Sequence, residues 1–329
     1  MKTLDAKLDA LAARPDGGDF IICYAADPDM GGGLRPTIGQ GIDPAVWRDE
    51  MAAITEAGHI DILLASVSTM AHLARDRGLF RESPVTPAIR ANDTTDIWMV
   101  RGGSYSTQPS RPFATTTVRE AMYGTLHPEP DQAVDVPLGL WSITFNNDLE
   151  ADERSLLRYR DFRAEAAQEG FRHFVEVFNP NVADPGIDGP VGDYVNDCIA
   201  RMLAGVPRAS RPEFLKVAYN GPHALEDLVT GIDVVVGVLG GPPSTANDSF
   251  TLVRDVKRSG GRVALFGRRI KVADSPILFC ELLRRVADDE LSPEDATREY
   301  HGRLTAAGIT PSRSLEDDLA IETPELLGS

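Results

Sequence analysis

The segment Phe214-Leu215-Lys216-Val217-Ala218-Tyr219 is a short apolar run that ends at the turn Asn220-Gly221-Pro222, a pattern that predicts a buried β-strand. Its one charged residue is Lys216. The chain has five lysines, and the other four lie among polar or charged neighbours. A desolvated amine can lose its proton and attack a carbonyl carbon, whereas a guanidinium stays charged. The structural alternative is a lysine that extends to solvent at the strand end or pairs with a buried carboxylate, and both interpretations remain open.

Apolar runs of the same kind recur along the chain and alternate with amphipathic stretches. The predicted strands are residues 20–25, 60–66, 86–92, 137–145, 171–178, 214–219, 234–239 and 261–266. The predicted helices are residues 44–57, 69–77, 116–123, 150–168, 190–203, 223–230, 245–258 and 275–288. Eight strand–helix units with nearly continuous apolar strands predict an α/β fold, a closed (β/α)8 TIM barrel. A doubly wound open sheet is the alternative, and it is weakened because no Gly-x-Gly-x-x-Gly follows the first strand.

The predicted barrel accounts for most of the chain. We expect residues 1–302 to form a single domain with a long insertion around residues 93–137, which glycines and prolines interrupt repeatedly. Residues 303–329 follow as an acidic tail. Connections as long as this insertion usually carry function or an interface.

Composition excludes several classes of partner. The net charge of -17 argues against nucleic acid, whose phosphates require clustered basic groups. The three cysteines are widely spaced, which favours a reducing cytoplasm over a disulfide framework. We find no signal-peptide core and no apolar run near the roughly 20 residues that cross a membrane. His173 and His223 each lack a second histidine at metal-ligand spacing, so neither a metal nor another cofactor is predicted.

The residues at the carboxyl ends of the strands indicate where a ligand would bind, because these ends surround one pocket in a TIM barrel. Gly240-Gly241 follows the seventh strand and Gly267-Arg268 follows the eighth. Their backbone N–H groups, together with Arg268, predict a phosphate site. Glu176 lies within the fifth strand, where it either forms a structural ion pair with Lys216 or Arg90 or takes part in catalysis.

Three segments of the chain resemble a known family. They are Leu215–Pro222, Gly240–Thr245 and Ala264–Ile270, which are similar to the last three strand ends of the archaeal-type class I fructose-bisphosphate aldolases. Those enzymes belong to the wider DeoC/LacD group of Schiff-base aldolases, which are TIM barrels. Tyr24-Ala25-Ala26-Asp27 is similar to the family's first-strand end. The resemblance implies a Schiff-base lysine at Lys216, an aspartate at Asp27 that handles the substrate, and a phosphate site at Gly240, Gly241, Gly267 and Arg268.

The chain also departs from this family at the fourth strand. The family's tyrosine general acid is missing, and Phe145 occupies its position in this comparison. Proline replaces the usual basic residue at Pro243. These differences put fructose bisphosphate itself in doubt as the substrate. Schiff-base chemistry still requires proton transfers, and the candidate groups are Asp27, Asp29, Glu176 and Tyr219.

Together these features predict a class I, metal-independent aldolase, a carbon–carbon lyase that acts on a phosphorylated ketose or a related keto compound. A Schiff-base enzyme that transfers an acyl or ketol group between phosphorylated sugars is one alternative. A non-catalytic barrel that binds phosphosugars is another. We expect a cytoplasmic homo-oligomer with neither a nucleic acid nor a membrane as partner.

Overall fold

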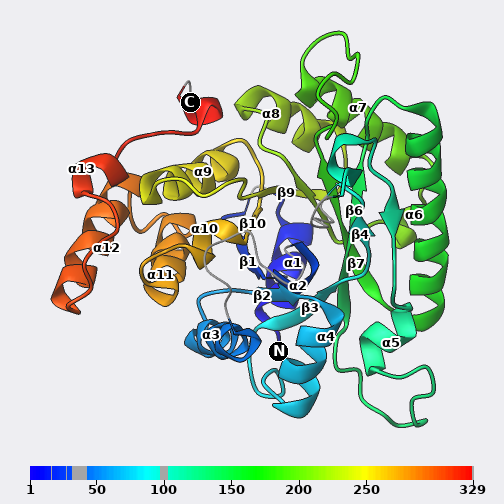
Figure 1. The fold of residues 1–329 in the computed structure, drawn as a ribbon, viewed down its shortest axis with the longest axis horizontal. Helices are drawn as coiled ribbons and strands as arrows, with labels where there is room; N and C mark the ends of the chain where they lie inside the picture. Colours follow the sequence, from blue (N-terminus) through cyan, green and yellow to red (C-terminus); the bar gives the residue numbers. More distant parts are fainter. Residues whose placement is uncertain (16, 27, 32–42, 97–102, 328–329) are drawn as a thin grey trace.

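The computed structural model describes residues 1–329 except 16, 27, 32–42, 97–102 and 328–329. Eight parallel strands close into a barrel in the order β1-β10-β9-β8-β7-β6-β3-β2, so the predicted (β/α)8 TIM barrel is confirmed (Figure 1). The barrel strands are β1 (Ile21–Ala25), β2 (Ile62–Ala65), β3 (Thr86–Arg90), β6 (Leu138–Thr144), β7 (Arg172–Phe178), β8 (Phe214–Val217), β9 (Val235–Leu239) and β10 (Val263–Phe266). Each lies within one of the predicted strands.

Helices surround this barrel. They are α1 (Thr3–Ala13), α2 (Pro28–Gly31), α3 (Pro44–Ala57), α4 (Val67–Met70), α5 (Val118–Tyr123), α6 (Leu149–Glu169), α7 (Val191–Ala204), α8 (Pro222–Gly231), α9 (Ala246–Arg258), α10 (Arg268–Lys271), α11 (Pro276–Ala287), α12 (Pro293–Ala306) and α13 (Leu315–Asp318). The insertion contains α5 and a short antiparallel pair of strands, β4 (Asp93–Thr94) and β5 (Pro112–Phe113). Helix α4 continues into a π-helical segment, Ala71–Asp76, which explains the single longer helix predicted there.

Helix α6 shows how local sequence sets the helix ends. The Asp148 side chain accepts a hydrogen bond from the backbone N–H of Ala151 and caps the first turn. Gly170 ends the helix with a positive φ of 70°, a conformation that glycine adopts without strain. Between these ends, the helix buries Tyr159 and Phe162 against the barrel.

Helix α1 lies across the amino-terminal end of the barrel, in the centre of the ring of strands (Figure 1). Its Leu4 and Leu11 join a buried interior cluster with alternate residues of the strands. The strand members are Ile21, Cys23, Ile62, Leu64, Ala88, Leu138, Leu140, Phe174, Phe214, Val263 and Leu265. Lys2, just before the helix, donates hydrogen bonds to the carbonyls of Phe80, Ser83 and Val85. The amino-terminal half of the barrel interior is therefore filled with side chains, and a ligand would have to bind at the carboxyl ends of the strands.

The alternation of side chains along the strands decides which polar residues face the barrel interior. Phe174 and Phe214 belong to the interior cluster. Two residues further along the same strands are Glu176 and Lys216, which are paired in the register of β7 and β8. Both side chains therefore face inward, one layer nearer the carboxyl end.

The carboxyl-terminal residues pack against α9. The predicted boundary between the barrel domain and the acidic tail, at residues 302 and 303, lies inside helix α12. Residues that follow α12 bind the first turn of α9. Asp318 accepts a hydrogen bond from the backbone N–H of Ala246 at 2.7 Å, and Thr245 donates to the carbonyl of Ala320 at 2.8 Å. His301 lies 2.9 Å from Asp318. These contacts hold the tail against the barrel.

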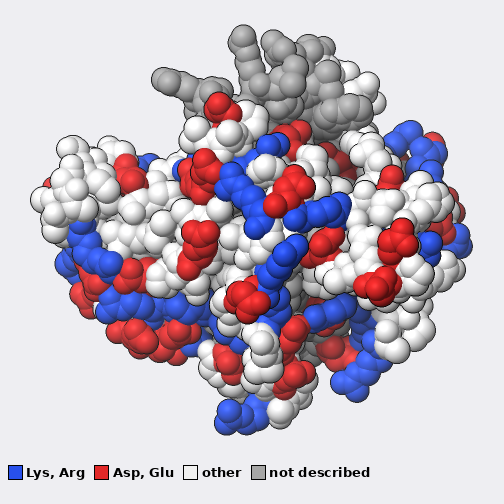
Figure 2. All heavy atoms as spheres, turned by 90° about the horizontal axis from the view of Figure 1, so that it is seen from below, with Lys and Arg blue, Asp and Glu red and all other residues white. Residues whose placement is uncertain are grey.

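Acidic and basic side chains are interspersed over the face drawn in Figure 2. Described ion pairs such as Arg77 with Asp49 and Lys271 with Glu50, both at 2.5 Å, place cations next to carboxylates. Within the described part of the chain, we find no helix both long and apolar enough to span a bilayer.

Candidate functional site

Lys216 belongs to a buried polar cluster on adjacent strands of the barrel, in which Glu176 is the shared partner. Its Nζ is 2.5 Å from Glu176 Oε1, and Arg90 Nη1 is 3.2 Å from Oε2 of the same carboxylate. The Ser142 hydroxyl donates to Glu176 Oε2 at 2.8 Å and accepts from Arg90 Nη1 at 2.8 Å. Lys216 is 5% exposed and Glu176 is 1% exposed. The ion pair considered from the sequence is therefore present, and it is shared with Arg90.

The Glu176 carboxylate contacts two cations in this cluster, Lys216 and Arg90. Burial would raise the pKa of Glu176, but Lys216 and Arg90, together with the hydrogen bonds from Lys216 and Ser142, outweigh it and hold the pKa below its usual value. Glu176 is thus ionised at neutral pH. Of its two cationic partners, only the lysine can release a proton to become a nucleophile.

Asn92 fixes the position of Ser142. Its Oδ1 accepts from the backbone N–H of Ser142 at 2.6 Å, and its Nδ2 donates to the carbonyl of Ser142 at 2.9 Å. We did not predict Ser142 or Asn92 as site residues, and we considered Arg90 only as an ion-pair partner. In the sequence, Asn92 is the last residue of the predicted strand 86–92, whereas Arg90 and Ser142 are polar residues two and three positions before the ends of their predicted strands.

A cavity of about 590 Å³ opens at the carboxyl ends of the first three barrel strands. Its polar lining residues include Asp29, Ser66, Ser68, Arg90 and Asn92. Asp29 accepts hydrogen bonds from the hydroxyls of Ser66 at 2.5 Å and Ser68 at 3.0 Å. Arg90 connects this cavity to the buried cluster, because it lines the cavity and also binds Glu176. Lys216 is not among the residues that line this cavity.

The two glycine turns expected to bind phosphate lie side by side at the ends of β9 and β10. Gly240 donates its N–H to the carbonyl of Leu265 at 3.2 Å, so that donor belongs to the sheet. Gly241 has a φ of 69°, a backbone conformation that favours glycine. Arg268 is exposed. This leaves the N–H groups near Gly241 and Gly267, with the Arg268 side chain, as the anion-binding groups in our prediction.

Arg269, which we did not predict, joins these two turns. Its guanidinium donates to the carbonyl of Gly240 and to the hydroxyls of Ser244 and Ser249, and it is 4% exposed. Burial lowers the pKa of Arg269 to about 10. It also reaches Thr323 of the carboxyl-terminal segment at 3.4 Å. We infer that Arg269 holds the two turns together, whereas Arg268 faces the solvent.

The remaining candidates have different locations. Asp27 lies outside the described residues. Tyr219 packs against the outer core, and its pKa is raised to about 12, first by burial and then by Asp255 and Glu226 of the neighbouring helices. Phe145 is also buried in the outer core, so it does not face the barrel interior, where alternate residues of β6 end with Ser142 and Thr144. Neither Tyr219 nor Phe145 belongs to the polar cluster around Lys216.

No protein-family model and no curated protein sequence matches the chain. Several solved structures do. A fructose-bisphosphate aldolase from Slackia heliotrinireducens aligns with a TM-score of 0.66 at 14% identity, covering 92% of each chain. The resemblance to these aldolases is confirmed at the level of the fold. An archaeal fructose 1,6-bisphosphate aldolase aligns with a TM-score of 0.58 at 15% identity, covering 87% of this chain and 100% of its own.

A further solved structure of an archaeal fructose-1,6-bisphosphate aldolase has its catalytic lysine covalently bound to the carbinolamine intermediate of the substrate. It aligns with a TM-score of 0.57 at 14% identity, covering 87% of this chain and 100% of its own. The chain therefore has an aldolase-like fold, in which Lys216 occupies an interior position on a barrel strand.

Proposed function

We propose that this protein is a class I, Schiff-base aldolase that acts on a phosphorylated ketose or a related keto compound. The observation that carries the proposal is the amine of Lys216, which is buried inside the barrel near its carboxyl end and is 2.5 Å from the carboxylate of Glu176. A lysine in such a position can form an imine with a carbonyl carbon. The fold shared with aldolases supports the same chemistry.

In the proposed reaction, Lys216 Nζ releases a proton to water and attacks the carbonyl carbon of the substrate. The resulting carbinolamine loses water to give an iminium. A carboxylate base takes the proton of the substrate hydroxyl that becomes the aldehyde oxygen, the electron pair of the breaking carbon–carbon bond moves to the iminium, and the aldehyde leaves. Protonation of the enamine and hydrolysis of the imine release the ketone fragment and regenerate the amine. The same steps in reverse make the bond.

Glu176 is suited to stabilise the iminium. Its depressed pKa makes it a weak base, so it is a poor store for the proton that Lys216 releases. A fixed negative charge 2.5 Å from the reacting nitrogen instead favours a cation at that nitrogen. We therefore assign Glu176 as the counter-ion of the iminium, and Asp27 or Asp29, which follow β1 in the sequence, as the candidate base that takes the proton of the substrate hydroxyl in cleavage.

Reductive trapping tests this function. Borohydride added together with dihydroxyacetone phosphate, a small phosphorylated ketone, is expected to fix a covalent adduct on Lys216 because it reduces the imine to a stable amine. Peptide mass spectrometry identifies the modified residue. The other four lysines serve as internal controls. An adduct on none of the lysines, or on a lysine other than Lys216, would contradict the proposal.

The phosphate site has a separate test. Replacing Arg268 with glutamine removes one exposed charge from the two turns, and we expect about a tenfold higher concentration of dihydroxyacetone phosphate for half-maximal trapping. Trapping of dihydroxyacetone, which lacks the phosphate, should stay unchanged. Arg258→Gln, an exposed arginine at the end of α9, is the matched control. An equal effect of Arg268→Gln on both ketones would place the phosphate elsewhere.

A second candidate function is a non-catalytic barrel that binds phosphosugars. It is favoured by the closed ion pair of Lys216 and by the missing fourth-strand tyrosine. This function predicts saturable binding of dihydroxyacetone phosphate by calorimetry, with no adduct after borohydride. The calorimetric and trapping experiments together therefore separate the two.

A further inference from the structure

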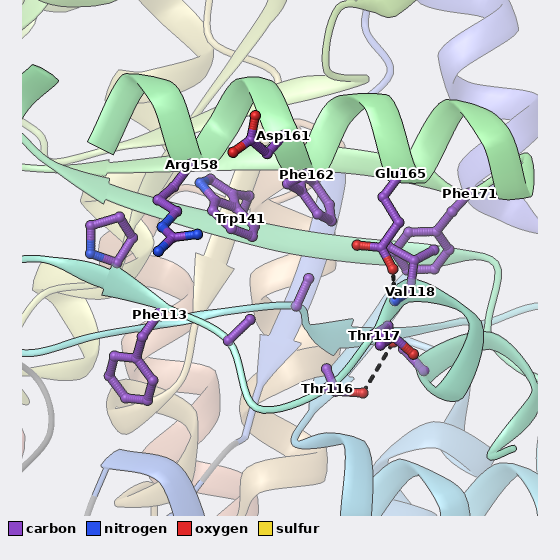
Figure 3. Close-up of a pocket in the computed structure, with 14 residues that line it drawn as sticks. Phe113, Thr116, Thr117, Val118, Trp141, Arg158, Asp161, Phe162, Glu165 and Phe171 are labelled. Atoms are coloured by element: carbon purple, nitrogen blue, oxygen red, sulfur yellow. Dashed lines mark hydrogen bonds between the residues drawn. The ribbon is translucent and has the colours of Figure 1, made fainter. Parts of the chain in front are cut away.

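A second cavity, of about 320 Å³, lies outside the barrel between β6, α6 and the insertion (Figure 3). This cavity lies where two neighbouring helices, α5 and α6, differ in length. Helix α5 has six residues, whereas α6 has 21, so α5 covers only part of the barrel wall beside α6. The volume is within the range of sites that bind small molecules.

Four aromatic side chains line this cavity together with several polar groups. Phe113 comes from the insertion, Phe171 immediately precedes β7, and Trp141 comes from β6. The Trp141 indole is stacked on Phe162 of α6, with ring centroids 4.4 Å apart and an interplanar angle of 18°. Such walls favour a planar apolar group between them.

Several polar groups that line the cavity already have partners. Glu165 accepts from the backbone N–H of Val118 at 2.9 Å, and Thr117 forms a capping box with Glu120. Asp161 accepts two hydrogen bonds from Arg160, at 2.8 and 3.1 Å. These groups are therefore engaged within the protein.

Two hydrogen-bond donors at one end of the cavity, Trp141 Nε1 and the Arg158 guanidinium, differ from these groups in their hydrogen bonding. The Trp141 side chain is buried, and its Nε1 has no hydrogen-bond partner in the described part of the chain. Arg158 is exposed and, among the described residues, forms no ion pair. Figure 3 shows Arg158 and the Trp141 indole at one end of the cavity and Glu165 and Val118 at the other. A buried N–H without an acceptor is unfavourable, so it indicates a missing partner.

We propose that this cavity binds a small carboxylate with a planar apolar body. The carboxylate accepts hydrogen bonds from Arg158 and Trp141 Nε1, after Arg158 moves aside to admit it, and the body lies between the aromatic walls. A carboxylate fits these two groups because both are hydrogen-bond donors and Arg158 carries a positive charge. The site is separate from Lys216, so it does not depend on the proposed aldolase chemistry.

The test uses 3-phenylpropionate as the probe, with 3-phenylpropanol and 3-phenylpropylamine as uncharged and cationic analogues. Indole N–H resonances of the full chain are followed by ¹⁵N NMR, and Trp141→Phe identifies the Trp141 signal among the three tryptophans. We expect 3-phenylpropionate to shift the Trp141 signal saturably, because its N–H gains an acceptor. The alcohol and the amine should bind at least tenfold more weakly.

Arg158→Gln is expected to weaken the binding of 3-phenylpropionate about tenfold, as loss of a charge-assisted hydrogen bond predicts. Arg154→Gln, on the same helix but paired with Glu150, is the matched control and should bind as the wild type does. Absence of a saturable shift would overturn the proposal. Equal binding of the alcohol, or an unchanged affinity in Arg158→Gln, would overturn it as well, because the cavity would then not select an anion.

Discussion

Replacing Lys216 with arginine is expected to reduce the cleavage of phosphorylated ketoses on the order of 10⁴-fold or more. The guanidinium can retain the ion pair with Glu176, but it does not lose its proton and forms no imine. The measurement is the release of aldehyde from a panel of phosphorylated ketoses, and circular dichroism checks that the variant is folded. The same panel distinguishes cleavage from group transfer between sugars.

Lys257→Arg is the control for this experiment, since Lys257 lies on α9 and pairs with Asp289 at 2.7 Å. It should leave turnover unchanged. A folded Lys216→Arg variant with wild-type turnover would eliminate the Schiff-base mechanism. This conclusion would not depend on the outcome of the Arg268→Gln test of the phosphate site.

Replacing Glu176 with glutamine is expected to lower the free energy of unfolding by about 3–5 kcal/mol, because two buried cations would lose their shared carboxylate. Urea unfolding at neutral pH measures this loss. Glu150→Gln, which breaks the exposed pair with Arg154, is the control and should change it by less than about 1 kcal/mol. If Glu176→Gln also lowered the free energy of unfolding by less than about 1 kcal/mol, the buried cluster would contribute little to stability.

The pH dependence of this effect follows from the lowered pKa of Glu176. The stabilisation is present above the ordinary carboxyl pKa of about 4.3 and is lost as the pH falls through the lower value of the folded state. The free energies of unfolding of the wild type and of Glu176→Gln should therefore approach each other only at acidic pH. In the double variant Glu176→Gln/Lys216→Met, part of the lost stability should return, because the buried amine that has lost the carboxylate of Glu176 is itself removed.

Much of the fold could be predicted because the strands are short apolar runs separated by turns. Residues 44–57 were predicted as a helix and form α3 with the same bounds, since Asp43 caps its start and Gly58 ends it. The contact between Lys216 and Glu176 was one of two interpretations of Glu176, and the paired register of β7 and β8 produces it.

Other features depend on three-dimensional packing that periodicity does not reveal. Arg268 and Arg269 are adjacent and chemically identical in the sequence, and only the direction of α10 decides which is buried. The cavity beside Trp141 depends on the short length of α5 relative to α6. The assembly of the chain into a homo-oligomer and the phosphate site at Gly240, Gly241, Gly267 and Arg268 remain predictions.

The position of α1 has a kinetic consequence for the proposed reaction. Because that helix and the side chains above it obstruct the amino-terminal end, both reactants must use the same entrance. The ketone that becomes bonded to Lys216 then has to arrive before the aldehyde and depart after it. Steady-state kinetics should accordingly follow an ordered sequence, in which the ketone fragment, as the last product to dissociate, competes with the ketose for the free enzyme.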